Sequence, residues 1–174
     1  MKNKKNFYLS IFLITVIFLV LLLGLKKEKN YYSQSELKKI NSSIFLKTLY
    51  SEKKIFLSDV LLEDKLNLIN IWASWCLPCK AEHSYLVSLN LNFDINLVGI
   101  NYKDNLENSK KFLKDLGNPY DSILIDTDGT KSIELGAIGV PETYLIDKEY
   151  NIIKKFVGPL DQEDYENIIN LIQK

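Results

Sequence analysis

The stretch "WASWCLPCKAEH", residues 72–83, decides the fold, because two cysteines stand two residues apart behind a tryptophan. The chain contains no other cysteine. Such a pair occurs in zinc sites, in haem-attachment sequences, in structural disulfides and in redox-active dithiols. The residues around the pair favour one of these four sites over the others.

Three of the four sites fit the sequence poorly. A structural zinc site needs four ligands, whereas Cys76, Cys79 and the single histidine, His83, supply three. Covalent haem attachment needs a histidine directly after the second cysteine, and this chain has Lys80 there. A structural disulfide would close so short a loop that it would constrain little of the unfolded chain. The sequence therefore favours a redox-active dithiol.

The local pattern also fits a reactive dithiol. Residues 66–72, "LNLINIW", form an apolar run that predicts a buried strand, and a helical pattern follows over 78–91. Cys76 would then open a helix, where unpaired N–H groups and the positive end of the helix dipole stabilise a thiolate. Cys79 would lie three residues further on the same face, within disulfide reach. We expect Cys76 to be the attacking nucleophile and Cys79 the resolving cysteine.

Length and charge exclude some functions. The chain has 174 residues, enough for one domain with a sizeable core. It balances 22 lysines against 22 acidic residues and contains no arginine. Nucleic-acid-binding proteins usually have a basic excess and use arginine for bidentate phosphate contacts, so nucleic acid is not an expected partner. Residues 30–174 hold 16 lysines and 21 acidic residues, a net charge of −5.

An apolar run near the N-terminus predicts a membrane anchor. Residues 6–25, "NFYLSIFLITVIFLVLLLGL", carry no charge, and as a helix they would span about 30 Å, the thickness of a bilayer core. The alternative, a cleaved signal peptide, would have a shorter apolar region before a small-residue cleavage site. The sequence thus predicts a cytoplasmic N-terminus over 1–5, a transmembrane anchor over 6–25, a polar linker over 26–43 and a globular domain over 44–174.

The periodicity of the remaining chain predicts an α/β domain. Apolar runs predict further strands, and amphipathic patterns predict further helices. The strands are expected at 44–50, 55–58, 95–101, 122–126, 143–147 and 151–158, and the helices at 105–117, at 131–135 and after Asp161. A first hairpin, a βαβ crossover and a final hairpin and helix together predict a mixed central sheet with helices on both faces.

Four stretches resemble one known family. The cysteine stretch resembles the active site of thioredoxin-fold oxidoreductases. "GINYKD" (99–104), "LGNPYDS" (116–122) and "GVPETYLID" (139–147) narrow the resemblance to the DsbE/CcmG family, the membrane-anchored thiol–disulfide interchange proteins of bacterial cytochrome c maturation. The resemblance runs from about Ile44 to the C-terminus. It implies a thioredoxin fold with an N-terminal β-hairpin and an extra αβ insertion.

The resemblance implies a dedicated reductant. Such a protein would keep the CxxCH cysteines of apocytochrome c reduced for haem attachment, directly or by resolving a disulfide of another maturation protein. Electrons would come from a transmembrane thiol donor of the DsbD or CcdA type. The implied location is the bacterial inner membrane, with a single-pass anchor and the C-terminal domain in the periplasm, where disulfides persist. No cofactor and no metal are implied beyond the Cys76–Cys79 disulfide.

The resemblance also implies residues that bind the substrate. Val140 and Pro141 resemble the cis-proline segment of the fold, which lies beside the CxxC and presents backbone groups to a peptide. Trp75 is expected to be exposed and functional, whereas Trp72 is expected in the core. Glu142 is expected as a carboxylate at the groove edge, where it would attract a basic client. The alternative is that Glu142 only orients the proline loop.

One carboxylate is a candidate proton acceptor. Thioredoxin has a buried acid six residues before its first cysteine, and this chain has Asn70 at that place. Glu82 lies one helical turn beyond Cys79 and is the nearest carboxylate that could take its proton, as the family pattern also suggests. Partial burial would raise its pKa. The alternative is a solvated helix carboxylate. His83 is expected at the surface.

Two rival functions remain compatible with these residues. The first is an enzyme of the same fold with another client, such as a general membrane-anchored reductase or a thiol peroxidase. Peroxide turnover would identify the peroxidase. The second is an anchored binding module with an inert disulfide, which is not an enzyme. Its reduction potential would lie below about −300 mV, as is typical of structural disulfides.

Overall fold

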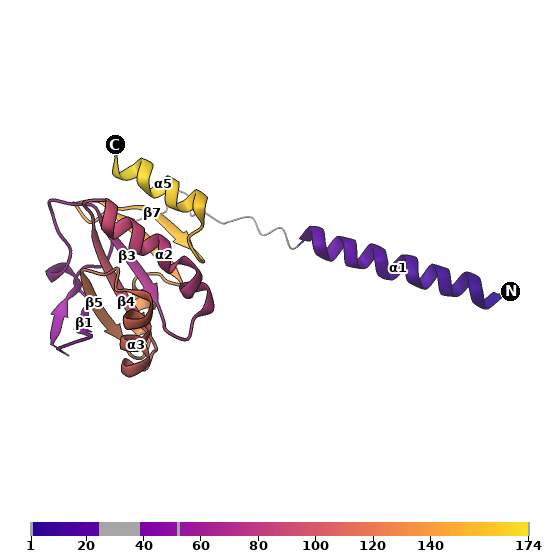
Figure 1. Cartoon of the computed structure of the whole chain (residues 1–174), viewed down its shortest axis with the longest axis horizontal. Coiled ribbons are helices and arrows are strands. Elements are labelled where there is room, and N and C mark those ends of the chain that lie inside the picture. Colours follow the sequence, from indigo (N-terminus) through magenta and orange to yellow (C-terminus); the bar gives the residue numbers. More distant parts are fainter. Residues whose placement is uncertain (1, 25–38, 52, 174) are drawn as a thin grey trace. The chain divides into compact units, whose positions relative to one another are not determined.

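The computed structural model describes residues 2–24, 39–51 and 53–173 (Figure 1). The chain divides into two compact units, residues 1–30 and residues 31–174. The first contains the helix α1 (Lys2–Gly24). The second contains the sheet and all remaining helices that the structure describes, and we refer to it as the body.

The anchor prediction is wrong. Among the described residues, no helix combines the length and the apolar character that are needed to cross a membrane. The finding corrects the predicted transmembrane segment at 6–25 and the predicted location, a single-pass inner-membrane protein with its C-terminal domain in the periplasm.

Most of the predicted linker, residues 26–43, lies outside the described residues, but its last part belongs to the body. Lys39 forms a β-bridge with Asn151. The backbone N–H of Ile40 donates to the carbonyl of Tyr150 at 2.9 Å, and the Ile40 side chain is buried. The folded body therefore begins a few residues before the predicted hairpin.

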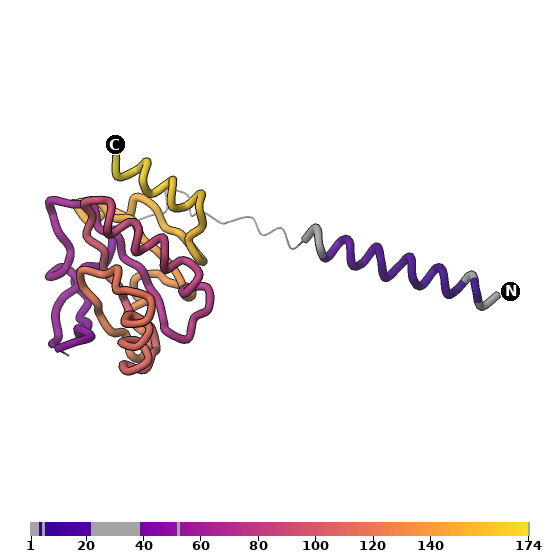
Figure 2. Tube along the Cα trace, viewed as in Figure 1, coloured from indigo at the N-terminus to yellow at the C-terminus, as the bar shows by residue number. Residues whose placement is uncertain are grey.

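A seven-stranded mixed sheet forms the centre of the body, as the sequence predicts (Figure 1), and Figure 2 follows the path of the chain through it. Its strand order is β2-β1-β5-β4-β3-β6-β7. The three central strands β3, β4 and β5 are parallel, and all other neighbours pair antiparallel. The strands are β1 (Phe45–Thr48), β2 (Lys54–Phe56), β3 (Asn67–Trp72), β4 (Asn96–Tyr102), β5 (Ser122–Asp126), β6 (Glu142–Ile146) and β7 (Ile152–Val157).

The helices begin and end where their capping residues predict. Asp161 caps the last helix, because its side chain accepts from the backbone N–H of Asp164. Gly117 is the C-cap of the helix over Leu106–Leu116, with a φ of 89° that suits glycine at a helix end. The helices are α2 (Leu77–Asn92), α3 (Leu106–Leu116), α4 (Thr130–Glu134) and α5 (Gln162–Ile172). The predicted strand 55–58 is shorter than expected, because Leu57–Asp59 turn into a 3-10 helix, η1.

Both faces of the sheet are covered, which confirms the layered architecture. Leu68 and Trp72 of β3 lie in one core cluster with apolar residues of α2, α3 and α5. Ile69 and Ile71 alternate with them and lie in a second cluster, with residues of the β1–β2 hairpin and with Leu135 after α4. This alternation is the period of two that a strand imposes. A strand that is apolar on both faces is thus buried on both, as the run before the cysteines predicts.

A close approach at β4 places an aromatic pair beside the centre of the sheet. The rings of Trp72 and Tyr120 stack with centroids 5.5 Å apart. A Cβ atom at Gly99 would lie 2.9 Å from both Trp72 Nε1 and the Tyr120 ring. Only glycine leaves room for this stack, so the backbone of β4 positions the Tyr120 ring. Trp72 is 1% exposed, which confirms its prediction as a core residue.

Candidate active site

The cysteine pair lies at the predicted junction between strand and helix. Cys76 is the N-cap of α2, and Cys76 and Cys79 form a disulfide with their Cα atoms 5.3 Å apart. The backbone N–H of Cys79 donates to the Cys76 sulfur at 3.1 Å. This N–H and the start of the helix would stabilise a thiolate at Cys76 once the disulfide is reduced. Among the residues that the structure describes, no N–H group donates to the Cys79 sulfur in the same way, and the division of roles stays a prediction.

Exposed apolar side chains stand on either side of the nucleophile candidate. Cys76 is 4% exposed and Cys79 is 2% exposed. Trp75 and Leu77, which flank Cys76 in the chain, are exposed by 58% and 77%. A partner that reaches the Cys76 sulfur therefore meets apolar surface. The exposure of Trp75 confirms its predicted place, and its functional role stays a prediction.

The "NYKD" segment holds the turn before the cysteines. The indole Nε1 of Trp75 donates to the carbonyl oxygen of Lys103 at 3.0 Å. The Asp104 carboxylate accepts from the backbone N–H and the hydroxyl of Ser74 and from the side-chain amide of Asn101. Burial opposes the charge on Asp104, but these hydrogen bonds hold its pKa below the usual range. Sequence analysis missed this role, because only the fold brings the end of β4 to this turn.

The peptide bond between Val140 and Pro141 is cis, which confirms the expectation drawn from the resemblance. Val140 packs against the core cluster that contains Cys76 and Cys79. The Pro141 carbonyl accepts from the backbone N–H of Gly158 at 3.0 Å, which fixes the end of the loop against the residue after β7. That Val140 and Pro141 bind a client remains a prediction.

Glu142 does not lie at a groove edge. Its side chain is fully buried, and its carboxylate lies 2.8 Å from the ammonium group of Lys155. Its Oε1 atom accepts from the backbone N–H groups of Ile138 and Gly139 at 2.7 and 3.0 Å. A buried, paired carboxylate offers no exposed charge to a client, so the expected attraction of a basic segment is wrong. The contacts fit the alternative, in which Glu142 orients the proline loop.

Glu82 is a buried carboxylate and not a solvated one. Its Oε1 atom accepts from the Asn70 amide at 2.9 Å, and its Oε2 atom accepts from the backbone N–H of Leu160 at 2.8 Å. Burial raises the pKa of Glu82 to about 7; the two hydrogen bonds oppose this shift, and the Asp164 charge adds to it. A group with this pKa can accept and release a proton at neutral pH. Its service to Cys79 stays a prediction.

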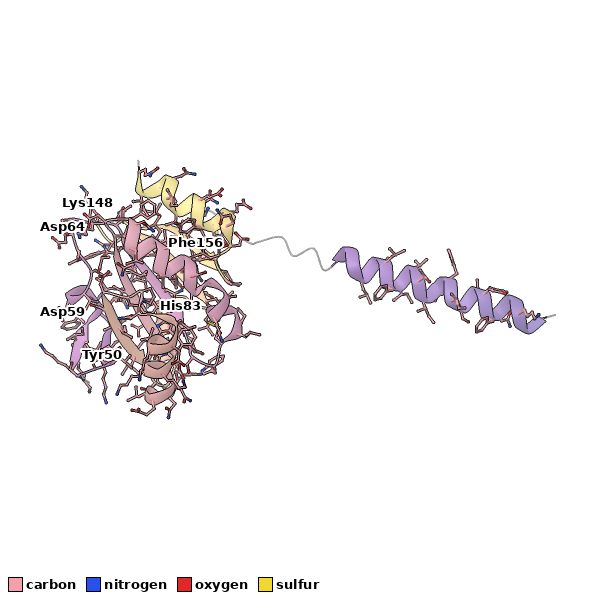
Figure 3. The ribbon with its side chains drawn as sticks, viewed as in Figure 1. Tyr50, Asp59, Asp64, His83, Lys148 and Phe156 are labelled. Atoms are coloured by element: carbon pink, nitrogen blue, oxygen red, sulfur yellow. A yellow bond between two sulfur atoms is a disulfide. The ribbon has the colours of Figure 1, made fainter. Side chains whose placement is uncertain are left out.

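His83 is buried, which corrects the expectation of a surface histidine. The residue, labelled in Figure 3, is 4% exposed, and its ring lies edge-on to that of Phe112 of α3 with centroids 5.0 Å apart. Its Nε2 atom lies 2.8 Å from the Gly117 carbonyl. Burial lowers the pKa of His83 and the Gly117 carbonyl partly restores it. The periodicity of α2 did not reveal this second contact surface, because α3 comes later in the chain.

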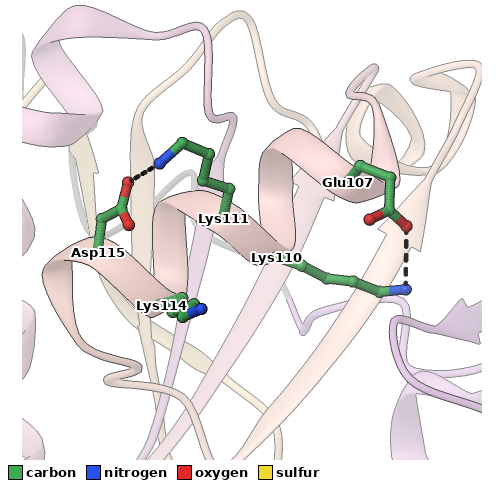
Figure 4. A pocket seen from close by; sticks show the side chains of 5 residues that line it. All are labelled: Glu107, Lys110, Lys111, Lys114 and Asp115. Atoms are coloured by element: carbon green, nitrogen blue, oxygen red, sulfur yellow. Dashed lines mark hydrogen bonds and ion pairs between the residues drawn. The ribbon is translucent and has the colours of Figure 1, made fainter.

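A surface hollow along α3 is a poor candidate for the active site (Figure 4). Glu107, Lys110, Lys111, Lys114 and Asp115 line it. Lys111 pairs with Asp115 at 2.6 Å and Lys110 pairs with Glu107 at 3.6 Å. Each exposed ion pair on one helix contributes less than about 1 kcal/mol to stability, and neither cysteine is among the residues that line the hollow. Within residues 2–24, 39–51 and 53–173, no group of three or more His, Cys, Asp or Glu residues could hold a metal ion.

Sequence relatives identify the family. The Redoxin family model matches residues 37–170. The thiol:disulfide interchange protein CycY of Rhizobium leguminosarum bv. viciae is 47% identical over 103 residues, 59% of this chain and 55% of that protein. DsbE of Escherichia coli K12 is 41% identical over 71% of this chain and 66% of its own length. DsbE of Pasteurella multocida is 35% identical over 99% of this chain and 96% of its own length.

Solved structures show the same fold. A DsbF homologue from Corynebacterium diphtheriae is 27% identical and superimposes with a TM-score of 0.67, over 84% of this chain and 94% of that one. DsbE from Chlorobium tepidum, at 22% identity, superimposes with a TM-score of 0.66 over 79% of this chain and 97% of that one. At that identity the second likeness shows the fold alone. With the family match and the Cys76–Cys79 disulfide, the chain belongs to the DsbE/CycY thiol:disulfide interchange proteins, which are thioredoxin-like thiol–disulfide oxidoreductases.

Proposed function

We propose that this protein is a reductant in cytochrome c biogenesis. It would keep the CxxCH cysteines of apocytochrome c, or a disulfide of a maturation partner, reduced for haem attachment. The observation that carries the proposal is the hydrogen bond from the Cys79 N–H to the Cys76 sulfur at the start of α2, because it favours a thiolate at the attacking position. The relatives named DsbE and CycY support thiol-redox chemistry with protein partners.

The reaction begins with the reduced pair. The Cys76 thiolate attacks one sulfur of a client disulfide, forms a mixed disulfide with it and releases the other client sulfur as a thiolate, which takes a proton from water. Cys79 then loses its proton to Glu82 and attacks the Cys76 sulfur. This step releases the second client thiolate and restores the Cys76–Cys79 disulfide. The client gains two electrons and the pair loses two.

The oxidised pair must be reduced again after each turnover. A second dithiol can do this by the same exchange in reverse, and we assign this task to a thiol donor of the DsbD or CcdA type. Exchange between sulfur atoms needs neither a metal nor an organic cofactor. The disulfide that the structure contains is the state that such a donor would meet.

Client binding is assigned to residues around the Cys76 sulfur. The exposed face of Trp75 offers an apolar contact. An extended client segment can pair with the backbone at Val140 and Pro141, a contact that depends little on the client's sequence. Glu142 acts on this segment indirectly, because it accepts hydrogen bonds from the loop that precedes the proline.

A general reductase is the second candidate function. The observation in its favour is the apolar exposed surface at Trp75 and Leu77, which would accept many clients. Partner trapping in cells separates the two functions. In Cys79→Ser the mixed disulfide at Cys76 cannot be resolved, so we expect it to accumulate with CxxCH proteins or with a maturation thiol protein, whereas Cys76→Ser should trap nothing.

The outcomes of trapping are distinct. A broad set of trapped proteins without CxxCH sequences would favour the general reductase. Equal trapping by both variants would contradict the roles of Cys76 and Cys79. Rapid peroxide turnover by the wild-type chain would instead support a thiol peroxidase, and a reduction potential below about −300 mV would support an inert disulfide.

A further inference from the structure

Asn70 lies at the centre of a buried group of polar side chains that the exchange reaction does not explain. Its Nδ2 atom donates to Glu82 Oε1 at 2.9 Å and to the Thr143 hydroxyl at 3.0 Å. Its Oδ1 atom accepts from the Tyr120 hydroxyl at 2.8 Å. Asn70, Glu82 and Thr143 are fully buried and Tyr120 is 5% exposed. Four separate segments of the body thus meet at one amide.

These contacts suit only one protonation state of Glu82. Both of the hydrogen bonds described at its carboxylate come from N–H donors, the Asn70 amide and the backbone of Leu160. A carboxylate accepts both bonds. A protonated carboxyl would direct its O–H at a donor, and a buried polar group without a partner is costly. The arrangement in the structure is therefore complete for the anion and incomplete for the acid.

A half-turn of the amide completes the arrangement for the acid. Rotation of the Asn70 amide by about 180° exchanges its oxygen and its nitrogen with little change in shape. The oxygen would then accept from protonated Glu82 and from the Thr143 hydroxyl. The nitrogen would donate to the Tyr120 oxygen. Both hydroxyl groups can donate or accept, so every member of the group has a partner in either state.

We propose that Asn70 is a positioning residue whose amide turns over when Glu82 gains or loses its proton. The buried carboxyl can then change its charge while each side chain of the group keeps a hydrogen-bond partner. This inference goes beyond the proposed function, because it rests on the contacts of Glu82 and not on the client. Within the proposed reaction it explains how Glu82 can hold the proton that Cys79 releases.

Other groups near Glu82 must be distinguished from Asn70 in a test. Asp164 of α5 is the acidic neighbour, and its charge raises the pKa of Glu82. Tyr120 lies before β5, and burial and the Glu82 charge raise its pKa well above the usual value. From α2 itself, Cys79 lies one turn earlier and is held in the disulfide, and His83 is engaged with the Gly117 carbonyl. Glu82 is thus the group expected to change charge near neutral pH.

The test follows side-chain amide resonances of the oxidised full chain by NMR. We expect the Asn70 NH2 signals and the Glu82 carboxyl carbon to shift together, with one midpoint, between about pH 5 and about pH 9. Contacts from the NH2 protons should move from Thr143 at high pH to Tyr120 at low pH. Asn67 is the internal control, because it is fully buried on the same strand and its amide donates to the backbone carbonyls of Leu62 and Lys65.

Two variants sharpen the test. Glu82→Gln removes the titration, so the Asn70 signals should become as insensitive to pH as those of Asn67. Asp164→Asn keeps Glu82 and should shift both midpoints to lower pH by the same amount, because a charge that raises the pKa is lost. Asn70 signals that stay constant while Glu82 titrates would overturn the inference, as would Asn70 signals that still titrate in Glu82→Gln.

This failure is separable from a failure of the proposed function. A static Asn70 amide in a chain that still traps CxxCH clients would remove the inference and leave the function. A titrating amide in a chain that traps no client would remove the function and leave the inference.

Discussion

The ammonium group of Lys155 on β7 lies 2.8 Å from the carboxylate of Glu142 on β6, and both side chains are buried. The same ammonium donates to the Gly136 carbonyl at 2.8 Å, while the carboxylate accepts from the N–H groups of Ile138 and Gly139. One ion pair thus fixes the whole loop that leads to the cis-proline. Loss of either partner would leave an uncompensated buried charge.

The first prediction concerns this ion pair. Lys155→Met and Glu142→Gln should each lower the free energy of unfolding by about 3–5 kcal/mol, because each leaves a buried charge without its partner. Denaturant unfolding of the full chain measures the loss. The matched control is Lys131–Glu134, a pair at the same 2.8 Å distance that is exposed. Its loss should cost less than about 1 kcal/mol. Equal losses at both pairs would contradict a special role of the buried one.

A second prediction concerns the pH dependence of stability. The folded chain raises the pKa of Glu82 from 4.5 to about 7, so between these values the folded state binds a proton that the unfolded state has released. Stability should therefore fall as pH rises through this window, by up to roughly 3 kcal/mol from this group, and level off above it. In Glu82→Gln the fall should be absent. An unchanged slope in this variant would assign the fall to another group.

Glu82→Gln should also slow thiol exchange. The variant keeps the shape of the side chain but cannot accept a proton from Cys79, so resolution of the mixed disulfide should become slower. Single-turnover reduction of a CxxCH peptide disulfide measures this step. The wild-type rate should rise with pH through about pH 7 as Glu82 loses its proton, and the variant should lack this rise. Equal rates at every pH would exclude Glu82 from the exchange.

The turn before Cys76 provides a third test site. The Asp104 carboxylate accepts hydrogen bonds from both the backbone N–H and the hydroxyl of Ser74. Asp104→Asn should therefore loosen the turn at Ser74 and weaken the hydrogen bond from the Trp75 indole to Lys103. Hydrogen exchange of the Trp75 indole N–H should become several-fold faster. Asp128→Asn is the control, since its carboxylate accepts two similar bonds from Thr130 in an exposed turn. A similar acceleration in both variants would mean that Asp104 has no local role.

The fifth prediction tests the packing beneath Asn70. Gly99→Ala would place a Cβ atom 2.9 Å from the Tyr120 ring and from Trp72 Nε1. Overpacking of this kind costs about 1–3 kcal/mol and should displace the Tyr120 hydroxyl from Asn70. Gly139→Ala is the matched control, because nothing lies within 4 Å of its added Cβ atom. If both variants unfold at the same denaturant concentration, the approach at Gly99 is not tight.

The sequence predicted local structure well where one segment carried the signal. Strand 66–72, the helix after Cys76 and the Asp161 cap each depend on residues that are neighbours in the chain. The mixed sheet could be predicted from the order of strands and helices along the chain. Predictions about exposure were less accurate, because burial of His83 or Glu142 depends on partners that come from distant segments.

The errors share a physical cause. Glu142 was expected in solvent because nothing near it in the chain identifies Lys155, which reaches it only through the pairing of β6 with β7. The structural role of Asp104 was missed for the same reason, since its partner Ser74 lies 30 positions earlier. The exposure of Trp75 could be predicted from the sequence, but the client that it contacts could not, because an exposed apolar side chain accepts many partners.

The hydrogen bond from Trp75 to Lys103 lowers the entropic cost that a partner would meet on packing against the indole. A large side chain that is already held loses little rotational entropy when a partner packs on it, a saving of about 0.5–1.5 kcal/mol for each such side chain. A client that packs on the Trp75 indole would therefore meet a side chain that is already ordered. Less of the binding free energy would then be spent on ordering this side chain, so a smaller contact area would suffice for the same affinity.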